Sequence, residues 1–356
     1  MQTLENLGWS DFFESQPMDA YDQMEGIIRA RVSREDRERY ELITPGGARV
    51  HARIGGGMRY RAVTREELPE VGDWVLARGP EHTGGDAMIL ALFERRTMLA
   101  RQSAGERTGL QIIAANVDTI FIVTSMNKEF VPRRLERYLM AARESGAEPV
   151  LVLNKRDLAR DPQWYVDRAT DSAAGAPVVA ISAIEGAQAL APWVVGGRTV
   201  ALVGSSGVGK STLINALAGA ELMDTGGIRT DDDDGRHTTT ARHLHPLPGG
   251  GVLIDTPGMR ELRLWAGDSG LDDLFEDIAQ LAESCRFRDC RHHDEPGCAV
   301  LAAVDTGELR SGRLVSYTKL GRELDWHQRR QDVATQRAQS RKLGKMYRNA
   351  QNKKKR

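Results

Sequence analysis

Gly204-Ser205-Ser206-Gly207-Val208-Gly209-Lys210-Ser211 decides the fold, because it fits the phosphate-binding pattern G-x-x-x-x-G-K-[ST] at every fixed position. The apolar residues 199–203 before it predict a short buried strand, and residues 211–218 behind it predict a helix that ends at Gly219. In such a loop the backbone N–H groups and the positive end of the helix surround an anion. We expect Lys210 to reach the β- and γ-phosphates of a nucleotide and the Ser211 hydroxyl to bind Mg²⁺. The predicted phosphate site comprises Gly204, Ser205, Ser206, Gly207, Val208, Gly209, Lys210, Ser211 and Thr212.

Apolar segments alternate with helical patterns on both sides of this loop. The predicted strands are residues 119–124, 149–153, 177–181, 199–203 and 251–254. Continuously apolar strands separated by helices indicate a parallel α/β sheet. Ligands of open sheets of this kind bind at the carboxyl ends of the strands, which is where the polar motifs of this chain stand.

Asn154-Lys-Arg-Asp157 follows one of these strands and matches the guanine-specificity motif N-K-x-D. The Asp157 carboxylate is expected to accept hydrogen bonds from N1–H and N2–H₂ of guanine. Adenine offers no such pair and would leave a buried carboxylate unpaired. Asn154 is expected to bond the guanine edge, and the stem of Lys155 to cover the ring. The motif therefore argues against an ATP-using phosphoryl-transfer enzyme.

Two further elements complete the set of GTPase motifs. Ser182-Ala183 is expected to place a backbone N–H near the guanine O6. Asp255-x-x-Gly258 is expected to supply a ligand to a Mg²⁺-bound water and a glycine N–H for the γ-phosphate.

The order of these motifs is unusual, since N-K-x-D and Ser-Ala precede the phosphate loop instead of following it. A circular permutation keeps the same sheet and moves the chain ends. It also connects the γ-phosphate sensor directly to the C-terminal domain, so that the nucleotide state can act on that domain by an order–disorder transition.

Residues 21–95 contain short apolar or alternating runs separated by glycine-rich turns, which is typical of an all-β domain. The runs are residues 26–32, 40–43, 50–54, 73–78 and 87–93. Five short strands favour a small closed barrel such as an OB-fold. Arginines accompany these strands at Arg29, Arg31, Arg49, Arg53, Arg59 and Arg61. Such barrels often bind nucleic acid, but exposed arginines are also ordinary on small domains, and both interpretations remain open.

All three cysteines fall within fourteen residues, in the pattern Cys285-x₄-Cys290-x-His292-x₅-Cys298. Three cysteines and a histidine at short spacing are typical of a closed, tetrahedral structural zinc site. Spacing alone leaves the fourth ligand open between His292 and His293. Helical patterns over residues 271–282 and 309–330 flank the cluster, and we expect the metal to hold these helices together.

Charge is segregated along the chain. From residue 310 onward there are 15 Lys/Arg and 3 Asp/Glu, a net charge of +12, which leaves −13 for the rest of a chain whose total is −1. Such a basic end favours a polyanionic partner, although a solvated charged helix is the alternative. There is no apolar run of transmembrane length and no signal-peptide pattern, so we expect a cytoplasmic protein with no membrane contact.

The permuted motif order, the stretch Gly235-Arg-His-Thr-Thr-Thr240 and the cysteine cluster together resemble the bacterial RsgA (YjeQ) family, the ribosome small-subunit-dependent GTPases. The resemblance covers nearly the whole chain. It implies that Thr239 is the switch I residue, that His237 is catalytic, and that His292 is the fourth metal ligand.

Two local features qualify this resemblance. Asp231–Asp234, just before the switch stretch, departs from the family's pattern and is expected to be a solvated loop. Met259 stands where many GTPases carry a glutamine that orients the attacking water, and a slow intrinsic rate is therefore expected.

The residues and the resemblance together predict a multidomain α/β protein. It has an N-terminal segment (1–20), an OB-fold-like β-barrel (21–95), a circularly permuted P-loop GTPase domain with a parallel sheet (96–265), a helical zinc-binding domain (266–330) and a basic tail (331–356). The predicted activity is hydrolysis of GTP to GDP and phosphate with Mg²⁺, stimulated by the small ribosomal subunit, in a monomeric late assembly factor that binds rRNA and one structural Zn²⁺. The alternative is a GTP-gated RNA-binding module in which hydrolysis is incidental.

Overall fold

The computed structural model describes residues 2–325 apart from residues 22, 37, 63, 80–84, 103–109, 224–241 and 256–268. The first of two compact units contains nearly all described residues up to 255, and the second contains those from 269 onward. The domain boundaries expected at residues 20, 95, 265 and 330 stay predictions. None of the described helices combines the length and the hydrophobicity that a membrane crossing requires.

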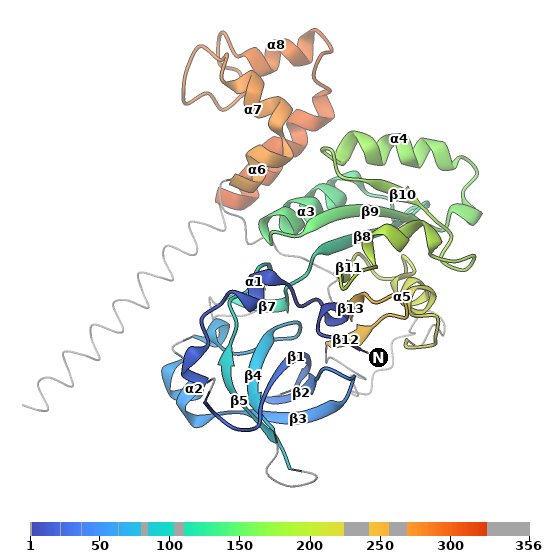
Figure 1. Ribbon diagram of the computed structural model, residues 1–356. Helices are drawn as coiled ribbons and strands as arrows, with labels where there is room; N and C mark the ends of the chain where they lie inside the picture. Colours follow the sequence, from blue (N-terminus) through green and yellow to red (C-terminus); the bar gives the residue numbers. More distant parts are fainter. Residues whose placement is uncertain are drawn as a thin grey trace, which may run out of the picture. The chain divides into compact units, whose positions relative to one another are not determined.

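The N-terminal part of the first unit is a closed five-stranded barrel (Figure 1). Its strands are β1 (Ile27–Asp36), β2 (Arg39–Ile43), β3 (Arg49–Ile54), β4 (Trp74–Arg78) and β5 (Ala87–Leu92). They pair in the order β1-β2-β3-β5-β4, and β4 closes the barrel on β1. Only β3 and β5 run parallel, and helix α2 (Gly56–Arg61) follows β3. Alternate residues fill the interior, as the period of two predicts, and the predicted barrel is confirmed.

An aromatic cluster attaches the N-terminal segment to the barrel. The segment forms η1 (Glu5–Leu7), α1 (Asp11–Glu14) and η2 (Asp19–Tyr21). Trp9 lies edge-on to Trp74 and to Phe93, with ring centroids 4.9 and 5.0 Å apart, and Phe13 packs beside them. Edge-to-face pairs of this kind are favourable beyond the area they bury.

The central part of the first unit is a six-stranded sheet in the order β10-β9-β8-β11-β13-β12. Its strands are β8 (Thr119–Ser125), β9 (Glu148–Asn154), β10 (Val178–Ala180), β11 (Thr199–Val203), β12 (His243–Pro246) and β13 (Val252–Asp255). All run parallel except β12. The five predicted strands are present, whereas β12 was not predicted, because it has four residues of which only Leu244 is fully buried.

Helices α3 (Pro132–Glu144), α4 (Pro162–Ser172) and α5 (Lys210–Ala218) connect the strands of this sheet. Short helical turns η3 (Arg65–Glu67), η4 (Arg156–Leu158) and η5 (Gln188–Trp193) occupy loops. A separate two-stranded sheet, β6 (Met98–Gln102) with β7 (Leu110–Ala115), links the barrel to β8 and was also not predicted.

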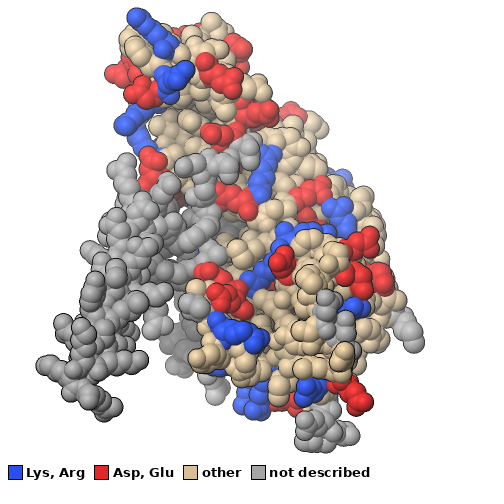
Figure 2. Space-filling view, turned by 60° about the vertical axis from the view of Figure 1, so that its left-hand side comes forward, with Lys and Arg blue, Asp and Glu red and all other residues tan. Residues whose placement is uncertain are grey.

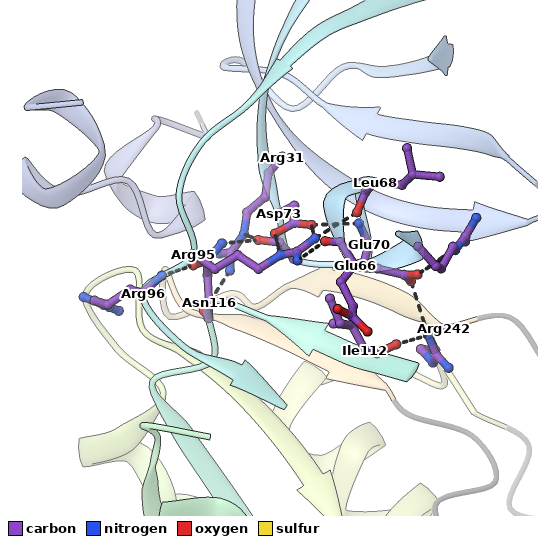
Figure 3. Close-up of polar contacts among 12 residues, drawn as sticks. Arg31, Glu66, Leu68, Glu70, Asp73, Arg95, Arg96, Ile112, Asn116 and Arg242 are labelled. Carbon is purple, nitrogen blue, oxygen red and sulfur yellow. Dashed lines mark hydrogen bonds and ion pairs between the residues drawn. The ribbon is translucent and has the colours of Figure 1, made fainter. Parts of the chain in front are cut away.

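The barrel and the central sheet are continuous, because Arg34 of β1 pairs with His243 of β12. Arg31 reinforces this junction from within and is fully buried (Figure 3). Its guanidinium donates to the carbonyl oxygens of Gly72 and Asn116 at 3.0 and 3.1 Å, to the Leu7 carbonyl, and to Thr199 Oγ1 at 2.8 Å. Burial lowers the Arg31 pKa to about 10. Arg31 is therefore structural, which corrects the view of it as a surface arginine.

The other barrel arginines are largely neutralised on the surface. Four of the predicted set pair with carboxylates, namely Arg29–Glu14, Arg49–Glu41, Arg53–Asp86 and Arg59–Glu38. Figure 2 shows basic and acidic side chains interspersed over the described surface on the face that it views. The barrel arginines thus give little support to a purely electrostatic RNA-binding face.

The second unit is helical. It consists of α6 (Ser269–Leu274), α7 (Glu276–Ala282), α8 (Ala299–Asp305) and a helix over residues 311–325. The predicted helix at 271–282 is interrupted at Phe275, which is fully buried against Tyr317 with ring centroids 5.5 Å apart. The Cys/His cluster lies in the loop between α7 and α8.

Candidate active site and metal centre

The phosphate loop connects β11 to α5, as its strand–loop–helix context predicts. Lys210 is the first residue of α5, and its Nζ donates to the carbonyl oxygens of Gly204 and Ser205 at 2.8 and 2.6 Å. Ser211 and Thr212 follow in the first helical turn. The ammonium group is thus held over the loop, where it can meet a phosphate.

Two glycines permit the close approach of neighbouring strands to this loop. Gly204 has φ +151°, and a Cβ on it would lie 2.2 Å from the carbonyl oxygen of Val123. Gly209 has φ +96°, and a Cβ on it would lie 2.3 Å from Nδ2 of Asn154. Any side chain at either position would force the loop away from β8 or from the guanine motif.

Asn154 joins the three loops that are expected to surround the nucleotide. It is the last residue of β9 and is 2% exposed. Its Nδ2 donates to the Val208 carbonyl at 2.9 Å, and its Oδ1 accepts from the Ala183 N–H at 3.0 Å. One N–H of the amide remains for guanine. The Ala183 N–H, however, has a protein partner that the sequence did not predict.

Lys155 and Asp157 lie beside this junction. Lys155 adopts a left-handed conformation with φ 62°, and its Nζ donates to the Gly207 carbonyl at 2.7 Å, so that its stem lies along the phosphate loop. Asp157 lies in η4 with its carboxylate exposed, and within the described residues it makes no hydrogen bond. An uncommitted carboxylate at this position fits the role of guanine acceptor.

Ser182 provides a test of whether the site fits a ligand. Its side chain is 3% exposed, and its Oγ has no hydrogen-bond partner among the residues that the structure describes. A buried hydroxyl without a partner is costly. Its place next to Ala183, and so next to the Asn154 junction, is consistent with a polar group of the nucleotide as its partner.

Asp255 ends β13 and is 8% exposed. It lies one residue beyond the pair Ala201–Ile254, at the edge of the sheet where β11 enters the phosphate loop. This pairing brings Asp255 close to the end of β11, where the phosphate loop begins, and its role at a Mg²⁺ site stays a prediction. The other expected switch residues lie outside the described residues: Asp231–Asp234, His237, Thr238, Thr239, Thr240, Gly258 and Met259.

The metal centre brings together Cys285, Cys290, His292 and Cys298, whose ligand atoms all lie within 4.8 Å of one another. In a tetrahedron with Zn–S of about 2.3 Å and Zn–N of about 2.0 Å, the S···S edge is about 3.8 Å and the N···S edge about 3.5 Å. Sγ of Cys285 and Sγ of Cys298 are 3.8 Å apart, and His292 Nδ1 lies 3.7 and 3.4 Å from them. The donor set therefore fits zinc in type and in spacing.

The geometry distinguishes the two adjacent histidines. His292 is 6% exposed and directs Nδ1 at the thiols, and burial lowers its pKa, which favours the neutral, metal-binding imidazole. His293 is exposed and contacts Arg322 through Nε2 at 2.6 Å. Glu295 orders the loop by accepting from the backbone N–H groups of Arg291 and His293, and these bonds hold its pKa at about 2.

The fold and the order of its loops define a circularly permuted P-loop GTPase with an N-terminal barrel and a C-terminal helical region that carries a Cys₃His cluster. The family model described as RsgA GTPase matches residues 92–265. The chain belongs to the RsgA family of GTPases.

Relatives match over nearly the full length. The chain is 46% identical over 360 residues to the small ribosomal subunit biogenesis GTPase RsgA of Opitutus terrae, covering 97% of this chain and 96% of the relative. It is 43% identical to the RsgA protein of Methanosarcina acetivorans, covering 95% and 90%. The crystal structure of YjeQ from Thermotoga maritima superposes with a TM-score of 0.63 at 26% identity, over 84% of this chain and 98% of that one.

Proposed function

We propose that this GTPase hydrolyses GTP to GDP and phosphate during late maturation of the small ribosomal subunit, and that the subunit stimulates the reaction. The observation that carries the nucleotide assignment is the Asn154 junction, which ties the guanine motif, the Ser-Ala loop and the phosphate loop into one site. The assembly role rests on relatives named small ribosomal subunit biogenesis GTPases, which are 42–47% identical to this chain over 84–96% of their length.

The described residues have separate tasks in this proposal. Asp157 accepts from guanine, the Lys155 stem covers the base, and Lys210 neutralises charge on the β- and γ-phosphates. Ser211 and Asp255 would hold Mg²⁺, which supplies further neutralisation of the phosphate charge when it is bound.

Two residues outside the described part of the chain complete the proposed mechanism. Thr239 is proposed as the switch residue that responds to the γ-phosphate, and His237 as the residue that orients the attacking water. Met259 can neither orient nor polarise the attacking water. The proposal therefore includes slow hydrolysis in the absence of the ribosomal subunit.

The Cys₃His cluster is proposed to bind one structural Zn²⁺ through Cys285, Cys290, His292 and Cys298. It holds the loop between α7 and α8, where few apolar side chains are buried. Zinc with four protein ligands has no open position, so its contribution is stability and not catalysis.

Contact with rRNA is proposed to depend mainly on the basic end of the chain, which carries a net charge of +12 from residue 310 onward. Phosphate contacts of this kind give salt-dependent affinity. The protein is proposed to act as a cytoplasmic monomer.

Nucleotide competition tests the guanine assignment. Asp157→Asn should shift preference from GTP towards XTP, because the amide can donate to the additional O2 of xanthine. Asp161→Asn is a matched control, since this nearby carboxylate caps α4 through the Trp164 N–H and faces no expected ligand. Equal affinity of the unmutated protein for ATP and GTP would contradict the assignment.

Single-turnover hydrolysis with and without ribosomal subunits separates the proposal from the GTP-gated RNA-binding alternative. Small subunits should accelerate hydrolysis, and free large subunits should do so much less. If zinc-loaded protein binds small subunits in a GTP-dependent way without acceleration, the gated-binding function replaces the proposed one.

A further inference from the structure

Glu70 is a buried carboxylate of the barrel that faces the GTPase domain. It lies between η3 and β4 and is 4% exposed. Its backbone is fixed, because the Glu70 N–H donates to Asp73 Oδ2 at 2.7 Å and Asp73 in turn receives two bonds from Arg95, at 2.8 and 2.7 Å (Figure 3). Arg95 also donates to the Glu66 and Leu68 carbonyls. The backbone that carries the Glu70 carboxylate therefore has a defined position.

The Glu70 side chain contacts Arg242, which is the residue directly before β12. Arg242 Nη1 lies 3.4 Å from Glu70 Oε2 and donates to the Ile112 carbonyl at 2.9 Å (Figure 3). The Arg242 side chain is 17% exposed. Its guanidinium thus connects the barrel, β7 and the start of β12.

Arg242 directly precedes the strand that pairs with the Asp255 segment. The next residue, His243, is in register with Asp255, the expected Mg²⁺-site carboxylate. A shift of Arg242 is therefore passed on through His243 to Asp255.

We propose that Glu70 is a positioning residue for GTP hydrolysis, which acts through Arg242 to fix the start of β12 and, with it, Asp255 on the paired strand β13. The inference rests on the proposed function, which assigns Asp255 to the Mg²⁺ site. It gives the barrel a part in catalysis that does not require the barrel to touch the nucleotide.

The environment of Glu70 makes this link dependent on charge. Burial raises the Glu70 pKa to about 7, opposed by the cations of Arg65 and Arg242. Arg65 lies 3.3 Å from Glu70 Oε1 and also contacts Glu35 at 2.8 Å. The other charged or titratable groups that act on Glu70 or share its surroundings are Glu35, Asp73, Arg95 and Tyr40.

Glu70→Gln removes the charge and keeps the shape. Glu35→Gln is the matched control, because Glu35 contacts Arg65 directly but acts on Arg242 only at longer range. Single-turnover hydrolysis at pH 8 by the full-length, zinc-loaded protein should fall by about 10- to 100-fold in Glu70→Gln, the size expected for a misplacement of about 1 Å. GTP affinity should stay within about twofold. Arg242→Gln should slow hydrolysis similarly, and the double variant should be no slower than either single one.

The pH profile separates positioning from a general loss of structure. Wild-type hydrolysis should rise with pH through a midpoint near 7, and Glu70→Gln should lack this rise. Glu70→Asp, which keeps the charge, should retain part of the rise and serves as a second variant if Glu70→Gln folds poorly.

The same rate measurements include outcomes that would overturn the positioning role of Glu70. Wild-type rates in Glu70→Gln, or equal losses in Glu70→Gln and Glu35→Gln, overturn the inference. If small subunits fail to stimulate the wild type while Glu70→Gln still lowers the intrinsic rate, the ribosome-dependent function is wrong and the positioning role of Glu70 stands.

Discussion

Replacement of Arg31 by methionine should destabilise the junction between the barrel and the central sheet. The substitution keeps an unbranched side chain but removes every donor. Among the described residues it leaves three acceptors without a donor, the carbonyl oxygens of Leu7 and Asn116 and the Thr199 hydroxyl, whereas the Gly72 carbonyl still accepts from Asn116 Nδ2 at 3.2 Å. Each orphaned buried acceptor costs about 1–3 kcal/mol. Methionine carries no charge, so the variant avoids the cost of burying the guanidinium, the same cost that lowers the Arg31 pKa. This gain offsets part of the sum. Three such losses, less this offset, give a net cost of about 3–5 kcal/mol.

The assay is thermal unfolding of the full chain followed by tryptophan fluorescence, since the Arg31 guanidinium lies 5.5 Å from the centroid of Trp74. For a unit of this size, 3–5 kcal/mol corresponds to a fall in unfolding temperature of about 6–20 °C. Arg29→Met is the control on the same strand, because Arg29 is partly exposed and pairs with Glu14 at 3.3 Å. Its cost should stay below about 1 kcal/mol. Equal stability of the two variants would refute the structural role of Arg31.

Three further predictions follow from the site and the sheet. Gly209→Ala should weaken GDP binding by about 10- to 100-fold, because a Cβ would clash with Asn154 and because alanine rarely adopts this backbone conformation. Equilibrium dialysis measures the affinity for GDP, and an unchanged affinity would argue against this geometry. Cys290→Ala should abolish binding of about one zinc per chain and destabilise the second unit without changing GDP affinity; elemental analysis and calorimetry test this, and undiminished zinc would contradict the ligand set. His245 has its pKa lowered to about 4, mainly by burial and next by His243, so the unfolded chain takes up the proton first and stability is lost as pH falls from 6.5 towards 4. Because His245 is only partly buried, the loss of stability is about 1–2 kcal/mol. His245→Asn should therefore lose less stability than the wild type between pH 7 and pH 4.5, as measured by urea unfolding. Identical losses of stability in the two proteins would contradict this contribution of His245.

Local pattern was sufficient where one segment carries its own signal. The phosphate loop requires glycine and lysine at fixed spacing, and the buried strands of the central sheet are continuously apolar, so both could be placed from the sequence. The Cys₃His cluster was equally visible because its ligands lie within one loop. The barrel strands followed from alternation and glycine-rich turns.

Long-range polar contacts could not be found in the same way. Arg31 looks like any strand arginine until the fold places Leu7, Gly72, Asn116 and Thr199 around it, at separations of up to 168 residues. Glu70 and Arg242 are 172 residues apart, and neither belongs to a motif. Strand β12 is too short for its period to be distinguished from a loop. Such features depend on tertiary pairing and not on local propensity.

The bonds of Arg31 have a consequence for how this protein can exchange parts with its relatives during evolution. A crossover near residue 95 would place one parent's barrel on the other's central domain. Such a hybrid would inherit Arg31 and Gly72 from one parent and Asn116 and Thr199 from the other. Gly72 and Asn116 offer backbone carbonyls, which any residue has, but Arg31 and Thr199 meet through their side chains. Because the loss of either side chain leaves buried polar groups of the other parent without a partner, viable hybrids must come from parents that agree at Arg31 and Thr199. Recombination should therefore transmit the barrel and the central domain as one heritable block.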